Sequence, residues 1–178
     1  MGEAARKVKM HNIVNDDLGY SVEDIRALLD YDRSSGQFTW RVDRGTNPTS
    51  GRPAGCANNN GYVRISISRA KFMAHRLAWL YVYGEWPEKH LDHIDGNRSN
   101  NRIENLRLAT PSENCANRRG RDGQLKGAHF LPSKGKWQAK ILKDGVSYFL
   151  GQFDTDCEAH AAYRGAARIL HGEFARAE

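Results

Sequence analysis

Residues 92–118 decide the fold of this chain, and they read DHIDGNRSNNRIENLRLATPSENCANR. Two short apolar runs, at 91–94 and 103–108, flank a turn-rich centre, so the segment predicts a hairpin with a long connection. Residues 110–113 (Thr-Pro-Ser-Glu) are a complete helix start, with a capping threonine, proline at the first helical position and a glutamate that closes the capping box. The segment is therefore predicted to fold as strand, loop, strand and short helix.

Chemistry-bearing side chains stand at the ends of these elements: Asp92, His93, Asn105 and Asn114. A hard divalent cation prefers oxygen ligands, and Asp92 with an asparagine carbonyl would leave the rest of the shell to water and phosphate, which suits Mg²⁺. A histidine beside that cation can accept a proton near neutral pH. Because neighbours on a regular strand face opposite sides, Asp92 and His93 can share a site only if the strand ends or bends there. The Asp95-Gly96 turn permits this, and the set suits phosphodiester hydrolysis.

The same stretch closely resembles the HNH endonucleases of the phage and intron-homing type, which share a ββα-metal fold. The resemblance implies that Asp92 is a metal ligand and that His93 is the general base. It assigns Asn105 to holding the imidazole in orientation. Asn114 falls where the family has His or Asn, as the second metal ligand. The implied cofactor is Mg²⁺ (or Mn²⁺), and the implied products carry 5′-phosphate and 3′-hydroxyl ends.

A second module is predicted over residues 127–178. Its three strand-like runs, GAHF, KWQAKILK and SYFLGQF, are separated by turn residues, and the Asp144-Gly145 pair is typical of a hairpin. A capping box at 155–158 opens a helix that is predicted to end near Gly172. Alternation along the central strand predicts that three residues face this helix and three face outward: Trp137, Ala139 and Ile141, then Gln138, Lys140 and Leu142.

This module resembles the AP2/ERF DNA-binding domain, a three-stranded antiparallel sheet backed by one helix, which lays its sheet in the major groove. The resemblance implies six positions at or near DNA: Lys126, His129, Lys134, Lys140, Ser147 and Phe149. Plant members rely on several arginines in the sheet, whereas Leu142 and Ser147 are poor readers of bases. We therefore expect the lysines to position phosphates, a contact that carries no sequence information by itself.

The charge of the chain agrees with an anionic partner. Its 27 Lys and Arg against 21 Asp and Glu give a net charge of +6. Between Arg118 and Val146, eight basic residues stand against two acidic ones, so this stretch holds the whole excess. Such clustering favours a phosphate-binding surface over a merely solvated basic face. Four arginines near the motif are candidates to clamp flanking phosphates: Arg102, Arg107, Arg118 and Arg119.

The composition also argues against several classes of protein, namely membrane, secreted, disulfide-rich and zinc-binding proteins. No stretch approaches the roughly 20 apolar residues that a bilayer span needs, and the first residues lack the apolar core of a signal peptide. The three cysteines lie far apart, so neither a disulfide framework nor a structural zinc site is expected. We therefore expect a cytoplasmic, DNA-associated protein of a bacterial or phage-infected cell, with no membrane partner.

Together these observations predict an α+β, modular protein, with a ββα-metal HNH nuclease core followed by a three-stranded antiparallel sheet and one helix. The predicted divisions are a flexible tail (1–20), an N-terminal α+β extension (21–72), the nuclease core (73–119), a linker (120–126) and the AP2-like module (127–178).

The predicted function is metal-dependent, homing-type nicking of double-stranded DNA by a monomer, while a dimer that cuts both strands stays open. Two alternatives also stay open. One is a non-catalytic regulator that binds DNA through the AP2-like sheet. The other is a structure-specific or RNA-directed nuclease with the same chemistry.

Overall fold

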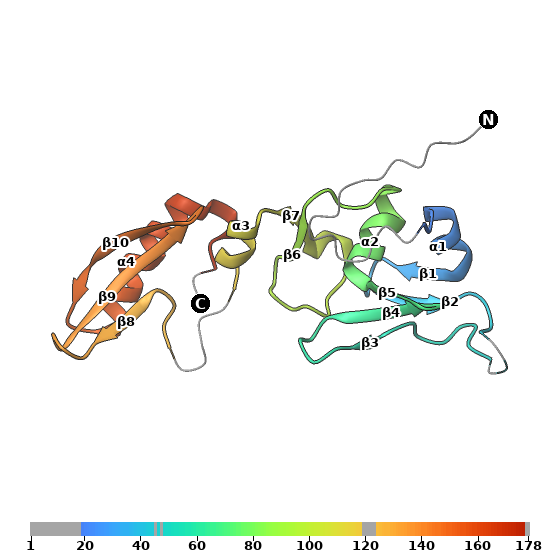
Figure 1. The fold of residues 1–178 in the computed structure, drawn as a ribbon, viewed down its shortest axis with the longest axis horizontal. Helices are drawn as coiled ribbons and strands as arrows, with labels where there is room; N and C mark the ends of the chain where they lie inside the picture. Colours follow the sequence, from blue (N-terminus) through green and yellow to red (C-terminus); the bar gives the residue numbers. More distant parts are fainter. Residues whose placement is uncertain (1–18, 45, 47, 119–123, 177–178) are drawn as a thin grey trace, which may run out of the picture.

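The computed structural model describes residues 19–44, 46, 48–118 and 124–176 (Figure 1). Nearly all of the predicted tail, most of the predicted linker and the candidate Arg119 lie outside these residues. The elements, in chain order, are α1 (Val22–Leu28), β1 (Leu29–Asp32), β2 (Gln37–Trp40), β3 (Cys56–Ala57), β4 (Val63–Ile67), β5 (Ala70–Met73), α2 (Ala74–Tyr83), β6 (His90–His93), η1 (Ile103–Asn105), β7 (Leu106–Ala109), α3 (Pro111–Ala116), β8 (Ala128–Leu131), β9 (Lys136–Lys143), β10 (Val146–Phe153), α4 (Asp156–His171) and η2 (Gly172–Phe174). In the described part of the chain, no helix combines the length and the apolar character needed to cross a bilayer.

The first helix begins as predicted and ends earlier than its apolar pattern suggests. Ser21 Oγ accepts from the Asp24 amide at 3.2 Å and the Asp24 carboxylate accepts from the Ser21 amide at 2.9 Å, which completes the capping box. Leu29, which continues the apolar stripe of α1, instead opens β1 and pairs with Trp40 of β2. Leu29 is fully buried in that strand, so pairing with β2 keeps its burial and adds ladder hydrogen bonds.

One hydrophobic core joins the N-terminal segment to the predicted nuclease core. It contains residues from both, among them Ile25 of α1, Ile65 of β4, Leu77 of α2 and Leu106 at the start of β7. As the alternating pattern of β4 predicts, Ile65 and Ile67 are buried. The core crosses the predicted division at residue 73, so burial of apolar surface couples residues 21–72 to the hairpin of β6 and β7.

The decisive segment folds as strand, loop, strand and short helix, as predicted. β6 and β7 are antiparallel, with His93 opposite Leu106. Thr110 Oγ1 accepts from the Glu113 amide at 3.3 Å, and the Glu113 carboxylate accepts from the Thr110 amide at 2.7 Å. Pro111 occupies the first turn of α3. Both halves of the capping box are thus formed, and they set where α3 begins, directly after β7.

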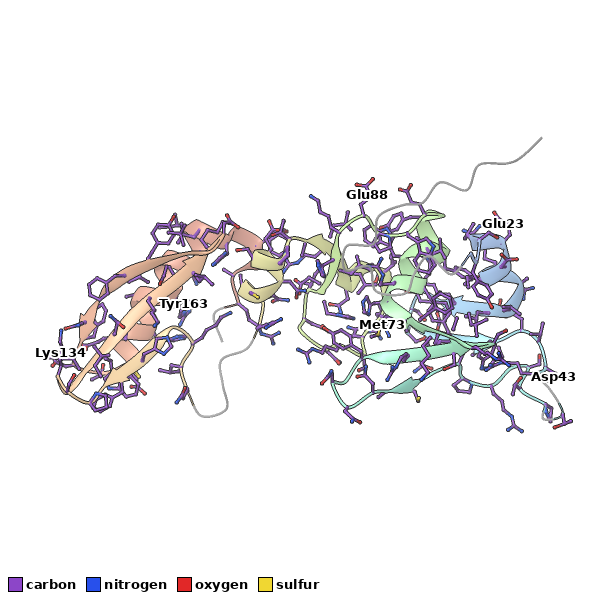
Figure 2. All side chains as sticks on the ribbon, in the orientation of Figure 1. Glu23, Asp43, Met73, Glu88, Lys134 and Tyr163 are labelled. Carbon is purple, nitrogen blue, oxygen red and sulfur yellow. The ribbon has the colours of Figure 1, made fainter. Side chains whose placement is uncertain are left out.

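The last three strands form an antiparallel sheet in the order β8-β9-β10, with α4 packed against one face (Figure 1). On the helix side, Trp137 and Ala139 pack near Ala159, and Ile141 packs with Tyr163, as the alternation predicted. Tyr163 of α4, labelled in this lobe in Figure 2, is buried with Ile141 and Ala167. Small residues on α4 allow this close approach of helix and sheet.

Gly36, in the turn between β1 and β2, should be intolerant of any side chain. Its φ is +73°, and a Cβ there would lie 2.4 Å from the Arg102 backbone nitrogen. We expect Gly36→Ala to destabilise the protein by about 3 kcal/mol, because left-handed strain and a clash with backbone add together. Urea unfolding of the two proteins measures the difference.

Gly84 provides the matched control for that measurement. It ends α2 with a φ of +83°, and no atom lies within 4 Å of a Cβ built there. Gly84→Ala should therefore cost only the conformational strain, about 1 kcal/mol. Equal losses in the two variants would show that the turn does not press against residues 101 and 102.

Candidate active site

Asp92 and His93 lie at the end of β6 and line one pocket of about 840 Å³. Both are 4% exposed. The chain turns directly after His93, where the Gly96 amide donates to the His93 carbonyl at 2.8 Å. Because the strand ends here, the opposite-face rule for strand neighbours does not keep the two side chains apart. Asn114 of α3 lines the same pocket, so the structure brings together three of the four predicted catalytic and metal residues.

The Asp92 carboxylate is held by Arg107, which was expected to clamp a flanking phosphate, and by Asn117, which the sequence did not indicate. Arg107 of β7 approaches Oδ2 through Nε at 3.0 Å and through Nη2 at 2.9 Å. Asn117, at the end of α3, donates Nδ2 to both carboxylate oxygens at 3.0 Å and to the His93 carbonyl at 2.7 Å. A buried carboxylate needs such partners, since an unpaired buried charge is costly.

This arrangement fits a bound divalent cation. Arg107 occupies Oδ2, while Oδ1 accepts from the Asn117 amide. A carboxylate oxygen carries two lone pairs, so Oδ1 can accept Asn117 and ligate a cation at the same time. The described residues contain no group of three or more His, Cys, Asp and Glu that could hold a metal. A cation here would rest on Asp92 and on an amide oxygen such as that of Asn114, with water and phosphate completing the shell.

The His93 imidazole is oriented by Asn101. Its Nε2 lies 3.3 Å from Asn101 Oδ1, and the Asn101 amide nitrogen donates to the Ser99 carbonyl at 3.1 Å. Since that nitrogen faces Ser99, the amide oxygen faces the ring and accepts from Nε2–H. The remaining ring nitrogen, Nδ1, is then the basic one. Asn101 is itself 2% exposed, and its carbonyl accepts from the Tyr31 hydroxyl at 2.7 Å, which ties it to β1.

Two further rings pack near the His93 imidazole. The His75 ring of α2 meets it edge-on at a centroid distance of 5.1 Å, and the Tyr62 ring lies at 5.9 Å. Burial lowers the pKa of His93, although Asn101 and the nearby carboxylates oppose that shift. The lowered pKa favours the neutral imidazole at pH 7, which is the form that can accept a proton.

Asn105 forms its side-chain hydrogen bonds with the loop that follows His93. Its Oδ1 accepts from the Asp95 amide at 3.1 Å, and its Nδ2 donates to Asp95 Oδ1 at 3.0 Å and to the Asn100 carbonyl at 2.9 Å. The direct contact with the His93 ring, which the resemblance assigned to Asn105, is made in the structure by Asn101. Asn105 instead fixes the turn that follows His93.

Arginines give the pocket a positive lining. Arg98, Arg118 and Arg176 line it, against the single carboxylate of Asp92 among the lining residues described. Arg98 lies over the Tyr62 ring at 5.0 Å, which sets that ring in the pocket wall. Of the four predicted clamps, Arg118 is in this lining, Arg107 is paired with Asp92, and the Arg102 side chain donates to the Ser34 carbonyl. Arg119 lies outside the described residues.

The predicted DNA-contacting residues of the second module lie in three places. His129, Lys140, Ser147 and Phe149 are exposed, with His129 opposite Gln138, Phe149 opposite Lys140 and Ser147 opposite Leu142 on the sheet face away from α4. Lys134 lies in the turn between β8 and β9, at the tip of the lobe in Figure 2. Lys126 does not lie on that face: its ammonium group donates to the carbonyls of Ala116 and Arg118. Burial lowers the pKa of Lys126 to about 8.

His75 should make the fold sensitive to acid. Burial, with a smaller effect of His93, lowers its pKa to about 3, and its buried Nδ1 has no hydrogen-bond partner among the described residues. The unfolded value is about 6.5, so the folded state binds fewer protons. Stability is therefore full above about pH 6.5 and falls as the pH drops towards 3.

We expect His75→Gln to reduce the slope of unfolding free energy against pH by about 1.4 kcal/mol per unit in this window. Urea unfolding at several pH values between about 6 and 4 measures it. His93 and His171, whose pKa values burial also lowers, titrate in both proteins, so the difference between the slopes isolates His75. Parallel curves would contradict a neutral, buried His75.

Comparison with known proteins agrees with this site. The HNH endonuclease family model matches residues 72–116. A protein of Acanthamoeba polyphaga mimivirus, named as an HNH endonuclease, is 34% identical to this chain over 118 residues. The aligned residues are 65% of this chain and 62% of that protein. Protein 3.8 of Escherichia phage T7 is 33% identical over 106 residues, 57% of this chain and 87% of the phage protein.

A prophage-derived protein of Bacillus subtilis, named as an HNH homing endonuclease, is 36% identical over 55 residues, 30% of this chain and 32% of that protein. The matched part thus spans less than two thirds of the mimivirus and Bacillus proteins. No solved structure matches the chain. The family match covers β6, β7 and α3, the elements that carry Asp92, His93 and Asn114, so residues 72–116 of this chain are an HNH endonuclease domain.

Proposed function

We propose that this protein is a metal-dependent endonuclease that hydrolyses one phosphodiester bond in duplex DNA. The observation that carries the proposal is the shared pocket: Asp92, His93 and Asn114 converge there beside three arginines. An oxygen-ligand pair, a base and a positive wall are what hydrolysis of a phosphodiester requires. The proposed metal ligands are Asp92 and Asn114, and the proposed ion is Mg²⁺ or Mn²⁺.

In this proposal, each residue of the site has its own role around the scissile phosphate. His93 Nδ1 takes the proton of the attacking water, while Asn101 holds Nε2–H and so keeps the ring in that tautomer. Asn105 fixes the turn after His93, and Asn117 and Arg107 hold the Asp92 carboxylate. A cation bound by Asp92 and Asn114 would neutralise phosphate charge and stabilise the leaving 3′ oxygen. By family resemblance, the products carry 5′-phosphate and 3′-hydroxyl ends.

The sheet of β8, β9 and β10 is proposed as the AP2-like surface that binds duplex DNA. Its outer face combines Lys140 with exposed apolar groups, since Leu142 is 59% and Phe149 is 62% exposed. A lysine suits a phosphate, and an exposed aromatic suits an apolar contact with DNA in the groove. In this proposal residues 127–178 position the DNA, residues 73–119 cut it, and residues 21–72 support the nuclease hairpin.

We propose that the enzyme nicks one strand. The described residues form one such pocket per chain, and one pocket addresses one phosphate at a time. A supercoiled plasmid incubated with the protein and Mg²⁺ should become the open circular form before any linear form appears. Chelation of Mg²⁺ should stop the reaction, and added Mg²⁺ should restore it.

Three outcomes of this assay would contradict parts of the proposal. Cleavage that persists under chelation would exclude the metal-dependent mechanism. Linear product formed at the initial rate would replace nicking by cleavage of both strands, as a dimer would produce. Tight DNA binding with no cleavage under any divalent cation would favour the regulator that binds DNA without cutting it.

A further inference from the structure

The segment Gly172–Arg176, called the strap below, leaves the second module at the end of α4 and returns to the nuclease hairpin. Arg107 of β7 donates Nη1 to the Glu173 carbonyl at 3.0 Å. The same guanidinium lies 3.8 Å from the centre of the Phe174 ring. Because Arg107 also pairs with Asp92, the strap contacts the residue that holds the proposed metal ligand.

Arg176, the last residue of the strap, lies at the pocket. Its amide donates to the Ala116 carbonyl at 3.5 Å, and its Nη1 donates to the Asp95 carbonyl at 2.8 Å. A Cβ on Gly96 would lie 1.8 Å from that Nη1, so the guanidinium rests directly against the turn after His93. Arg176 is a lining residue of the pocket that contains Asp92 and His93.

Lys126 secures the strap from the other side. Its ammonium group lies 3.5 Å from the Arg176 carbonyl while it also donates to Ala116 and Arg118 at the end of α3. The cation lies 5.8 Å from the Tyr163 ring of α4. One lysine therefore links α3, α4 and the strap, and this link sets the position of Arg176 relative to the pocket.

The positive lining of the pocket suits a phosphate as the ligand of Arg176. A guanidinium is planar and presents its N–H donors in a fork that matches the oxygens of a phosphate. Its neighbours in the lining, Arg98 and Arg118, are also cationic, and the pocket is open to a polyanion. Three guanidinium groups around one small site raise the local potential for phosphate.

We infer that Arg176 is a phosphate-binding residue of the cleavage site, supplied by the strap, and that it contacts the phosphodiester backbone at or next to the scissile bond. The inference rests on the proposed nuclease function, and it deepens that function by adding a residue far along the chain from the HNH motif. The second module then contributes to the site through the strap as well as through its sheet.

The test compares Arg176→Gln, Arg176→Lys and a matched control, Arg164→Gln, which removes the same charge from an exposed position on α4. In single-turnover plasmid cleavage, Arg176→Gln should slow the reaction by about 10²-fold, the usual effect of losing one charge-stabilising donor. Arg176→Lys should recover part of that loss because it restores the charge without the planar fork. Arg164→Gln should match the parent.

A second measurement separates phosphate binding from a merely structural tie. Each substitution is placed in a His93→Ala background, and duplex DNA affinity is measured over a range of salt concentrations. Loss of one phosphate contact should reduce the slope of log affinity against log salt by about 0.9 for Arg176→Gln. Arg176→Lys should keep the parental slope.

The outcomes are distinguishable. An unchanged salt slope in Arg176→Gln overturns the inference, whether or not cleavage slows, because a structural tie does not release counterions. Cleavage by Arg176→Gln at the parental rate also overturns it. If the parent itself does not cut, the proposed function fails, and the salt slope still reports on phosphate binding by Arg176.

Discussion

Replacing Asp92 by asparagine is expected to lower plasmid nicking by about 10³-fold or more at saturating Mg²⁺. The cation supplies several kcal/mol of transition-state stabilisation, and each 1.4 kcal/mol is about tenfold in rate. The neutral amide keeps the shape of the carboxylate but binds a hard cation weakly. Single-turnover rates of the two proteins on one plasmid measure the effect, and DNA binding should be largely retained.

The choice of asparagine follows from the structure. Asp92 pairs with Arg107, and their side chains are 5% and 14% exposed. Asp92→Ala would leave that arginine with neither charge partner nor acceptor, a loss that typically costs about 3–5 kcal/mol of stability and would confuse folding with catalysis. The amide oxygen of the Asp92→Asn variant can still accept from Arg107. Thermal unfolding of Asp92→Asn serves as the control for folding. A well-folded Asp92→Asn protein that nicks within about tenfold of the parent would remove Asp92 from the metal site.

Replacing His93 by alanine is expected to slow nicking by about 10²–10⁴-fold, the range for loss of a general base. The proposed metal ligands, Asp92 and Asn114, remain, so Mg²⁺ should still be required for the residual reaction. His90 offers a matched control, since it is an exposed histidine at the other end of β6. His90→Ala should cut at the parental rate.

The position of His93 also predicts whether the His93→Ala substitution lowers DNA affinity or the rate of cleavage. The ring contacts Asn101, Tyr62 and His75 rather than the outer surface of the second module. DNA affinity should therefore change little in His93→Ala, while the rate of the bound complex falls. A fall in affinity with an unchanged single-turnover rate would show that His93 binds DNA and does not activate water.

Much of the fold was predictable because its determinants are local. The capping boxes at Ser21, Thr110 and Thr155 begin α1, α3 and α4 at the predicted residues. The Asp144-Gly145 turn joins β9 to β10, and alternation gave the helix-facing side of β9. The chief difference is Leu29, where pairing with Trp40 converts the expected last turn of a helix into a strand.

The partners of the site residues were not predictable in the same way. Asn101 and Asn117 belong to an asparagine-rich stretch in which no spacing rule separates them from Asn105 and Asn114. Their low exposure, 2% and 6%, exists only once the loop is folded against β1 and α3. Lys126 was expected on the DNA face by resemblance, but the carbonyls at the end of α3 hold its ammonium group.

The sequence by itself determined the order of elements around the HNH motif and which residues are proposed to carry the chemistry, since periodicity, caps and turns act over a few neighbouring residues. Only the tertiary structure decided which amide orients His93, which arginine pairs with Asp92 and that Arg176 reaches the same pocket. Those choices depend on contacts between residues distant in the chain, which form because burial of His93 and Asp92 requires compensating polar partners.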